Sequence, residues 1–284
     1  MRRVRDPVRI TTVSGEALPA PALSNLKQRL ITGALGIPVA LLVVILGGWL
    51  LTVAGVAVAV IGVLEFYAVI AQRGLRPLMT GGVLLTAALT VSAAVGQPLW
   101  GLGIVMAGGP AAWMLGYRRP RDLAVTLAGV LYVGAPLSLL LLLRAHPDGL
   151  AWLLFVLVLT WSTDSFAYVG GRWWGRTPLA PHISPQKTLE GALIGTIGGV
   201  GAGMIVLWWA GLTSPATLLL VSTAPLAVMI GDLLESGLKR VCQVKDSHLA
   251  GLNLLPGHGG ILDRIDGLLL AAVLCAAVIF TLPA

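Results

Sequence analysis

Long apolar runs dominate the chain, and most of them show no alternation between a polar and an apolar face. Residues 123–143, for example, contain no charged side chain at all. A helix that is apolar all round is buried either in a very large core or in lipid. A chain of 284 residues is too short to bury so many helices in its own core. The pattern therefore predicts an all-α, polytopic integral membrane protein.

The length of the apolar runs gives the number of membrane crossings. A spanning helix needs about 20 mostly apolar residues. On this criterion the chain contains about nine transmembrane helices, at 30–48, 50–71, 79–96, 98–117, 122–143, 150–170, 190–211, 216–234 and 261–282. The boundary between the first two and that between the third and fourth are the least sharply defined, because only short glycine-containing turns separate them.

The composition and the placement of charge support this interpretation. Hydrophobic residues make up 57% of the chain and charged residues only 11%, whereas about a quarter of a soluble domain is charged. With nine spans and a cytoplasmic N-terminus, nearly all Lys and Arg residues fall on the inside and only Arg144 on the outside, as the positive-inside rule requires. The net charge of +7 is thus a signal of topology, and we expect no nucleic-acid partner. Cys242 and Cys275 fit neither a disulfide framework nor a metal-ligand spacing.

Composition also divides the chain into three parts. Residues 1–28 form a basic cytoplasmic N-terminal arm, residues 29–145 are nearly featureless transmembrane helices, and residues 146–284 form the predicted catalytic transmembrane region with cytoplasmic loops. The chain has no convincing internal repeat, which gives little support to a transporter built from inverted repeats.

Three carboxylates gather where the last two spans meet the cytoplasmic side. Asp232 ends the eighth span, and Asp263 and Asp266 begin the ninth, three residues apart and thus on one face of a helix. A carboxylate inside a membrane is costly unless it is paired or faces water, so for an isolated acid such as Asp164 or Asp232 the alternative is a structural ion pair or an interhelical hydrogen bond. Clusters of oxygen ligands suit Mg²⁺, which leaves positions open for substrate phosphates.

Cations and a glycine-rich turn accompany these acids. The cations are suited to phosphate oxygens and comprise Lys239, Arg240, Lys245 and Arg264. The turn, residues 256–260, leads directly into a helix N-terminus, where exposed backbone N–H groups favour anions. Carboxylates for a metal, cations for phosphates and a glycine turn together indicate a phosphoryl or nucleotidyl transfer site.

A second polar cluster lies on the sixth span and in the loop after it. Ser162, Asp164 and Ser165 interrupt an apolar run, and Arg172 and Lys187 follow. A loop of juxtamembrane cations whose side chains reach to the interface would explain the basic residues. It would not explain the polar residues inside the span, so we interpret the cluster as a second half of the site.

These stretches resemble a known family. Residues 236–240, 245–246 and 256–266 resemble the signature of the phosphatidate cytidylyltransferases, also called CDP-diacylglycerol synthases. Residues 164–172 and 184–191 are similar to that family's other characteristic stretch, and Glu65 followed by an aromatic residue is a further family-like feature. Gln186 and Leu189 depart from the pattern, and about four residues around His248 look like an insertion.

The resemblance implies a reaction and a set of residues. CTP and phosphatidate would give CDP-diacylglycerol and pyrophosphate, with Mg²⁺ as cofactor and a second, monovalent cation left open. The catalytic residues implied are Asp232, Lys239, Arg240, His258, Asp263, Arg264 and Asp266, of which Asp232, Asp263 and Asp266 would hold the metal. The substrate-binding residues implied are Ser162, Asp164, Ser165, Arg172, Ser184, Lys187, Glu190, Lys245, Asp246, Gly259 and Gly260. The resemblance also implies a homodimer in the bacterial inner membrane, with its active site facing the cytoplasm.

Two other classes of function remain open from the sequence. A related CTP-dependent lipid enzyme, such as a polyprenol kinase or a cytidylyltransferase for another lipid phosphate, would use the same kinds of residues. An ion transporter could use Asp164 and Asp232 as an ion path. Against the transporter, the acids collect at one membrane face beside cations instead of spacing along a pathway.

Overall fold

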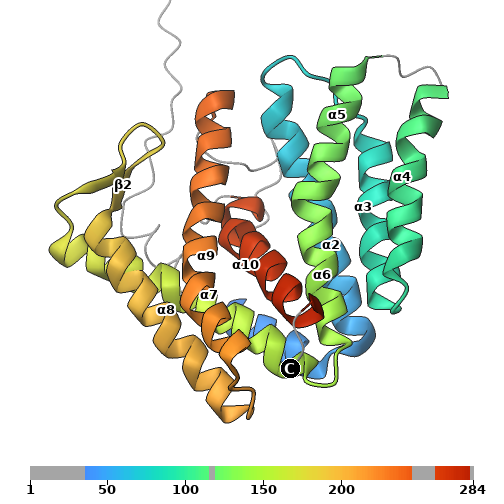
Figure 1. Ribbon diagram of the computed structural model, residues 1–284. Helices are drawn as coiled ribbons and strands as arrows, with labels where there is room; N and C mark the ends of the chain where they lie inside the picture. Colours follow the sequence, from blue (N-terminus) through green and yellow to red (C-terminus); the bar gives the residue numbers. More distant parts are fainter. Residues whose placement is uncertain (1–35, 115–118, 245–259, 282–284) are drawn as a thin grey trace, which may run out of the picture.

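The computed structural model describes residues 36–114, 119–244 and 260–281. Over these ranges the protein is helical apart from one short hairpin (Figure 1). After a first helix at Gly36–Leu46, the helices are α2 (Gly48–Ala71), α3 (Met79–Ala94), α4 (Pro98–Met114), α5 (Pro120–Gly129), the π-helix η1 (Val130–Gly134), α6 (Ala135–Arg144), α7 (Gly149–Trp174), α8 (Leu189–Trp209), α9 (Pro215–Cys242) and α10 (Leu262–Thr281).

Six helical segments are long and apolar enough to cross a membrane. They are α2, the continuous segment Pro120–Arg144, α7, α8, α9 and α10. The prediction of a helical integral membrane protein is therefore confirmed. The count of about nine spans is not, because the remaining described helices are shorter: Gly36–Leu46, α3 with 16 residues and α4 with 17.

The predicted span at 122–143 is one continuous helical segment with a π-helical turn in its middle. The N–H of Ala135 bonds to the carbonyl of Val130, five residues back. The next residue, Pro136, has no backbone N–H and cannot continue the regular α-helical pattern through this point. The extra residue in the turn accommodates the proline without a break in the helix.

The helices form two groups with α9 and α10 between them (Figure 1). On one side, α7 and α8 pack closely in opposite directions; on the other lie α2 to α6. The α7–α8 contact depends on four buried glycines at four-residue intervals on α8: Gly191, Gly195, Gly199 and Gly203. A Cβ at Gly195 would lie 2.7 Å from that of Ala167 on α7. Small residues of this kind let membrane helices approach closely.

Helix α10 belongs to the two larger hydrophobic cores. Its Ala271 and Cys275 pack with Phe155 and Leu220, and its Leu269 packs with Val63 in the second core. The C-terminal helix thus joins the N-terminal half of the chain to α7 and α9. Both cysteines are free and buried.

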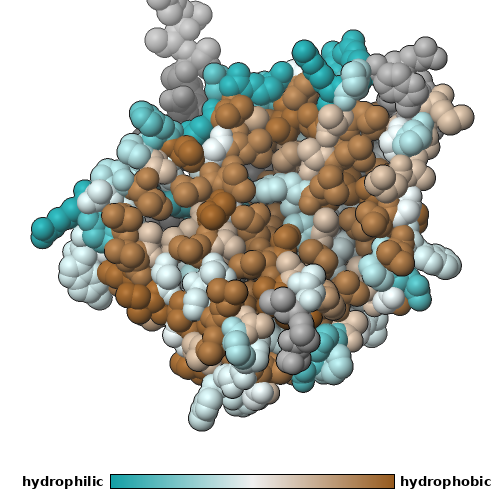
Figure 2. Space-filling model, in the orientation of Figure 1, coloured by the Kyte–Doolittle hydropathy of each residue, from teal (hydrophilic) through white to brown (hydrophobic). Residues whose placement is uncertain are grey.

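A two-stranded antiparallel hairpin connects α7 to α8, and the all-α prediction missed it. Strand β1 (Pro178–Ala180) pairs with β2 (Ser184–Thr188) in the register Pro178 to Thr188 and Ala180 to Ser184. The strands are short and contain prolines, so no alternation of apolar and polar residues marks them. In Figure 2 the visible face is mostly hydrophobic, and hydrophilic residues gather along its edges, above all along the top edge.

Candidate active site

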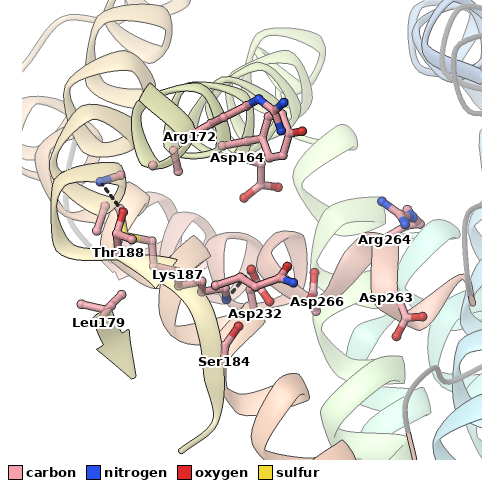
Figure 3. A pocket seen from close by; sticks show the side chains of 17 residues that line it. Asp164, Arg172, Leu179, Ser184, Lys187, Thr188, Asp232, Asp263, Arg264 and Asp266 are labelled. Atoms are coloured by element: carbon pink, nitrogen blue, oxygen red, sulfur yellow. Dashed lines mark hydrogen bonds and ion pairs between the residues drawn. The ribbon is translucent and has the colours of Figure 1, made fainter. Parts of the chain in front are cut away.

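A cavity of about 550 Å³ lies between α7, the hairpin, α9 and α10 (Figure 3). It brings together residues that are up to 102 positions apart, from Asp164 to Asp266. Its charged lining residues are Asp164, Arg172, Lys187, Asp232, Asp263, Arg264 and Asp266. The two polar clusters found in the sequence, on the sixth span and at the last two spans, therefore face one cavity.

Two glycines bring α9 and α10 together beside the cavity. A Cβ on Gly231 would clash with the backbone carbonyl of Asp266, and one on Gly267 would lie 2.8 Å from Val228. Asp232 and Asp266 directly adjoin these glycines in the sequence. The close crossing of α9 and α10 thus places the two carboxylates at the same level of the site.

An ion pair links the hairpin to α9 across the cavity. The ammonium group of Lys187, on β2, contacts the Oδ2 atom of Asp232 (Figure 3). The hydroxyl of Ser236, one turn further along α9, lies 3.4 Å from the Oδ1 atom of Asp232. Asp164 and Asp266 are near enough to Asp232 for the three charges to act on one another. Lys187 therefore offsets part of a concentrated negative charge.

Asp263 belongs to a second cluster beside the cavity. Its Oδ1 atom accepts a hydrogen bond from Lys239 Nζ at 3.0 Å, and its Oδ2 atom accepts the N–H of Gly260 at 2.9 Å. Lys239 Nζ also lies 2.6 Å from Oε2 of Glu235, whose side chain is 1% exposed. Glu235 was not among the site residues predicted from the sequence. The sequence feature that could have identified Glu235 is its position four residues before Lys239, which places the two side chains on one helix face.

A carboxylate of the N-terminal half reaches the beginning of α10. Glu65, on α2, accepts the backbone N–H of Ile261 at 3.1 Å and that of Leu262 at 2.7 Å. The first N–H groups of a helix have no partner within it, so Glu65 satisfies two of those of α10. In the N-terminal half of the chain, hydropathy predicts helices but no site residues. Only the family resemblance pointed to Glu65.

The side chains of three further residues hold the hairpin in place. Glu190 accepts the backbone N–H groups of Arg176 and Thr177, and the Thr188 hydroxyl accepts the N–H of Gly191 at the start of α8. Arg240 donates from Nε to the carbonyl of Ile183 at 3.1 Å, which ties the hairpin to α9. Glu190 and Arg240 thus support the cavity wall without lining it.

The structure separates the predicted site residues into three groups. Those that line the cavity are Asp164, Arg172, Ser184, Lys187, Asp232, Asp263, Arg264 and Asp266. Those outside its lining are Ser162, Ser165, Glu190, Lys239, Arg240 and Gly260. The remaining four, Lys245, Asp246, His258 and Gly259, lie outside the described residues. Tyr168, Gly171 and Thr188 also line the cavity; they lie in the stretches 164–172 and 184–191 that resemble the family, but they were not predicted as site residues.

The donor set of the cavity is compatible with a magnesium ion. In the described ranges, no three His, Cys, Asp or Glu side chains are gathered closely enough to hold a metal between them. Mg²⁺ does not require three, because it usually binds one or two carboxylates and completes its shell with water and substrate phosphates. Asp232 already contacts one cation, the ammonium of Lys187. Together with Asp266 it offers the hard oxygen ligands that this ion prefers.

Comparison with known proteins agrees with the site. The chain is similar to proteins named phosphatidate cytidylyltransferase: it is 32% identical to that of Synechocystis sp. over 87% of this chain and 94% of the relative. It is 34% identical to that of Brucella abortus, over 89% and 92%. A third relative, from Staphylococcus haemolyticus, is 40% identical over 51% of this chain and 54% of its own. The sequence profile of the cytidylyltransferase family matches residues 27–282, and the chain therefore belongs to the cytidylyltransferase family.

Proposed function

We propose that this protein transfers the cytidylyl group of CTP to phosphatidate, which gives CDP-diacylglycerol and pyrophosphate. The observation that carries the proposal is the cavity, which the carboxylates of Asp232 and Asp266 line together with the cations Arg172, at the end of α7, and Lys187, on the hairpin. This arrangement suits a reaction between a charged nucleotide and the phosphate of a membrane lipid. Proteins of the same family that are named phosphatidate cytidylyltransferase support the choice of substrates.

The reaction needs no nucleophilic side chain. A phosphate oxygen of phosphatidate attacks the α-phosphorus of CTP, a new P–O bond forms, and the bond from the α-phosphorus to the bridging oxygen of the β-phosphate breaks. The bond electrons leave with pyrophosphate. The protein then has two tasks: to align the two phosphates and to offset their negative charge.

The two substrates are assigned to different walls of the cavity. Arg172 at the end of α7 and Lys187 on the hairpin would bind the lipid phosphate, because both stand where a span meets polar residues. Arg264 in the first turn of α10 would bind the triphosphate, together with the positive end of the α10 dipole. Lys239 would hold Asp263 in place and adjust the charge around it.

Mg²⁺ would be held by Asp232 and Asp266, with Asp263 on the same rim of the cavity. The ion would offset the charge of the triphosphate and stabilise the leaving pyrophosphate. Lys187 contacts Asp232, so this lysine would become available to the lipid phosphate if a metal took its place at the carboxylate. The proposal also includes a second, monovalent cation, which would bind beside Asp266.

The membrane orientation completes the proposal. The distribution of Lys and Arg along the sequence predicts that the hairpin and the start of α10 face the cytoplasm, where CTP is available. The bacterial relatives support a location in the inner membrane. A span count of about nine and assembly as a homodimer belong to the same proposal.

The position of a radioactive label tests the reaction directly. The purified protein in detergent is given phosphatidate, Mg²⁺ and CTP labelled at either the α- or the γ-phosphorus. Transfer of the α-label to the lipid fraction, with the γ-label recovered in pyrophosphate, is the expected result. Transfer of the γ-label to lipid would identify a kinase instead. No labelled lipid with any phosphate acceptor, together with ion flux in liposomes without CTP, would favour the transporter.

Variants of the cavity carboxylates extend the test. Asp232→Asn and Asp266→Asn should each remove turnover while the protein still purifies as a folded species. The matched control is Asp148→Asn, an exposed carboxylate before α7 whose only described contact is with His146. Wild-type rates in either cavity variant would remove that residue from the metal site.

A further inference from the structure

The beginning of α10 is hydrogen-bonded to a side chain from the N-terminal half of the chain. Glu65 lies on α2, 196 and 197 residues before the two backbone N–H groups that it accepts, those of Ile261 and Leu262. Its side chain is only 2% exposed. A buried carboxylate inside a membrane protein is costly unless something compensates it, and here the start of a helix contributes that compensation.

The turn that Glu65 holds carries three cavity residues. Asp263, Arg264 and Asp266 all lie within the first five residues of α10 and line the cavity. A negative side chain at a helix N-terminus also interacts favourably with the helix dipole. Asp263 itself accepts the N–H of Gly260, so the turn is fixed by one carboxylate from α2 and by one of its own.

We infer that Glu65 is a positioning residue of the active site, which fixes the start of α10 against α2 and thereby sets where Asp263, Arg264 and Asp266 stand in the cavity. Glu65 does not line the cavity, so it acts through α10 and not on a substrate. The inference rests on the proposed function, because it assigns Glu65 to the nucleotide side of that site. Arg172 and Lys187, proposed for the lipid phosphate, stand on α7 and β2 and do not depend on this anchor.

The chemistry of the contact explains why a carboxylate stands at this position. Two N–H donors require two acceptor oxygens, and a carboxylate has no hydrogen to place against either donor. In Glu65→Gln the shape is retained, but the amide NH₂ group would face one of the two N–H groups. In Glu65→Asp both oxygens and the charge remain, on a side chain one methylene shorter. The two variants therefore separate loss of an acceptor from a shift in its position.

The test compares the two substrates in the full-length protein. In E65Q we expect the KM for CTP and the Mg²⁺ concentration for half-maximal rate to rise by roughly tenfold or more, with the KM for phosphatidate unchanged. E65D should show the same pattern to a smaller extent. A purely structural defect would reduce the fraction of active enzyme, and with it kcat, without changing only the nucleotide constants.

The control is Thr90→Val, which removes another buried polar group of the N-terminal half. The described hydrogen bonds of the Thr90 hydroxyl stay within its own helix, to the carbonyls of Thr86 and Ala87. The second measurement is the gain in Tm on addition of CTP and Mg²⁺ without phosphatidate. This gain should be smaller in E65Q than in wild type and unaltered in T90V.

The outcomes distinguish the inference from the proposed function. The role of Glu65 would be overturned if E65Q had the same KM for CTP, the same Mg²⁺ requirement and the same CTP-induced Tm gain as wild type. It would also be overturned if T90V showed the same shifts as E65Q. If E65Q does not fold, E65D decides by the same measurements. An inactive wild-type protein would count against the proposed function, and the difference in CTP-induced Tm gain would still decide on Glu65.

Discussion

Lys187 connects two walls of the cavity, the hairpin and α9. It stands on the hairpin and contacts Asp232 on α9. We expect Lys187→Ala to lower kcat/KM for phosphatidate by about 10- to 100-fold, because the variant loses the cation for the lipid phosphate and leaves Asp232 without its partner. Lys187→Arg should retain part of the activity, since it keeps the charge. Initial rates at varied phosphatidate concentrations measure the effect.

The control for Lys187 is Arg176→Ala. Arg176 is an exposed cation of the same loop that does not line the cavity. Only its backbone N–H makes a described contact, with Glu190, and an alanine keeps that group. An equal loss of kcat/KM in Arg176→Ala would mean that general attraction between basic residues and anionic lipid, and not the position of Lys187, accounts for the effect.

The buried cluster of Glu235, Lys239 and Asp263 predicts a loss of stability of a particular kind. Lys239→Met removes the one ammonium that contacts both carboxylates. Breaking a buried ion pair on one side costs about 3–5 kcal/mol, and here the two carboxyl groups would lose the cation that contacts both of them. We therefore expect a clear fall in the Tm of the detergent-purified protein.

A second variant identifies the cause of that fall. In the double variant Lys239→Met with Glu235→Gln, one of the two carboxyl groups that Lys239 contacts is also replaced. It should recover part of the stability lost in Lys239→Met, since contacting residues of one network are not additive. A double variant with the summed loss of both single variants would show that the charges act independently.

At the scale of elements, the crossing of α9 and α10 depends on a residue without a side chain. Gly231→Ala places a Cβ against the carbonyl of Asp266, so the helices must separate and carry Asp232 and Asp266 apart. We expect turnover to fall by at least about tenfold. Gly237→Ala on the same helix is the matched control, since among the described residues its Cβ would meet only the Ile183 side chain, at 3.9 Å. Similar activities in the two variants would contradict this account.

Hydropathy predicts which segments are helices but not where they end. The eighth span was predicted to end at residue 234, whereas α9 continues to Cys242. The additional residues are more polar and remain helical because Glu235 and Lys239 pair one turn apart. The hairpin was missed for a related reason: its stability comes from Glu190 and Arg240 contacts, which depend on tertiary structure and leave no periodic pattern.

The individual residues of the site were easier to predict than the contacts that they make with one another. Asp164 and Asp232 stand out because each is a carboxylate in or at the end of an apolar run. Their placement around a single cavity with Asp266 depends on how α7, α9 and α10 pack. The assignment of Lys239 and Arg240 to phosphate binding remains a prediction, and both side chains make contacts outside the cavity lining.

At the scale of the whole molecule, the two ends of α7 should be reachable from opposite sides of the membrane. Asp148 precedes the helix and His182 lies in the hairpin beyond its end, and both are exposed. In sealed inner-membrane vesicles of known orientation, Asp148→Cys and His182→Cys should react with a membrane-impermeant maleimide from opposite faces. The native cysteines, Cys242 and Cys275, are buried and should give little background. Labelling of both variants from one face would contradict the proposed topology.

The contact between Glu65 and α10 also has a consequence for the order in which the protein is made. Glu65 leaves the ribosome 197 residues before Leu262, its last partner. At roughly 5–20 residues per second, this interval lasts about 10–40 s. During that time the carboxylate is already in or near the membrane, and the helix that satisfies it does not yet exist. A chain that stops short of α10 would lack the two backbone N–H donors that Glu65 bonds in the folded protein, so its N-terminal half would carry a buried acid with two hydrogen bonds fewer.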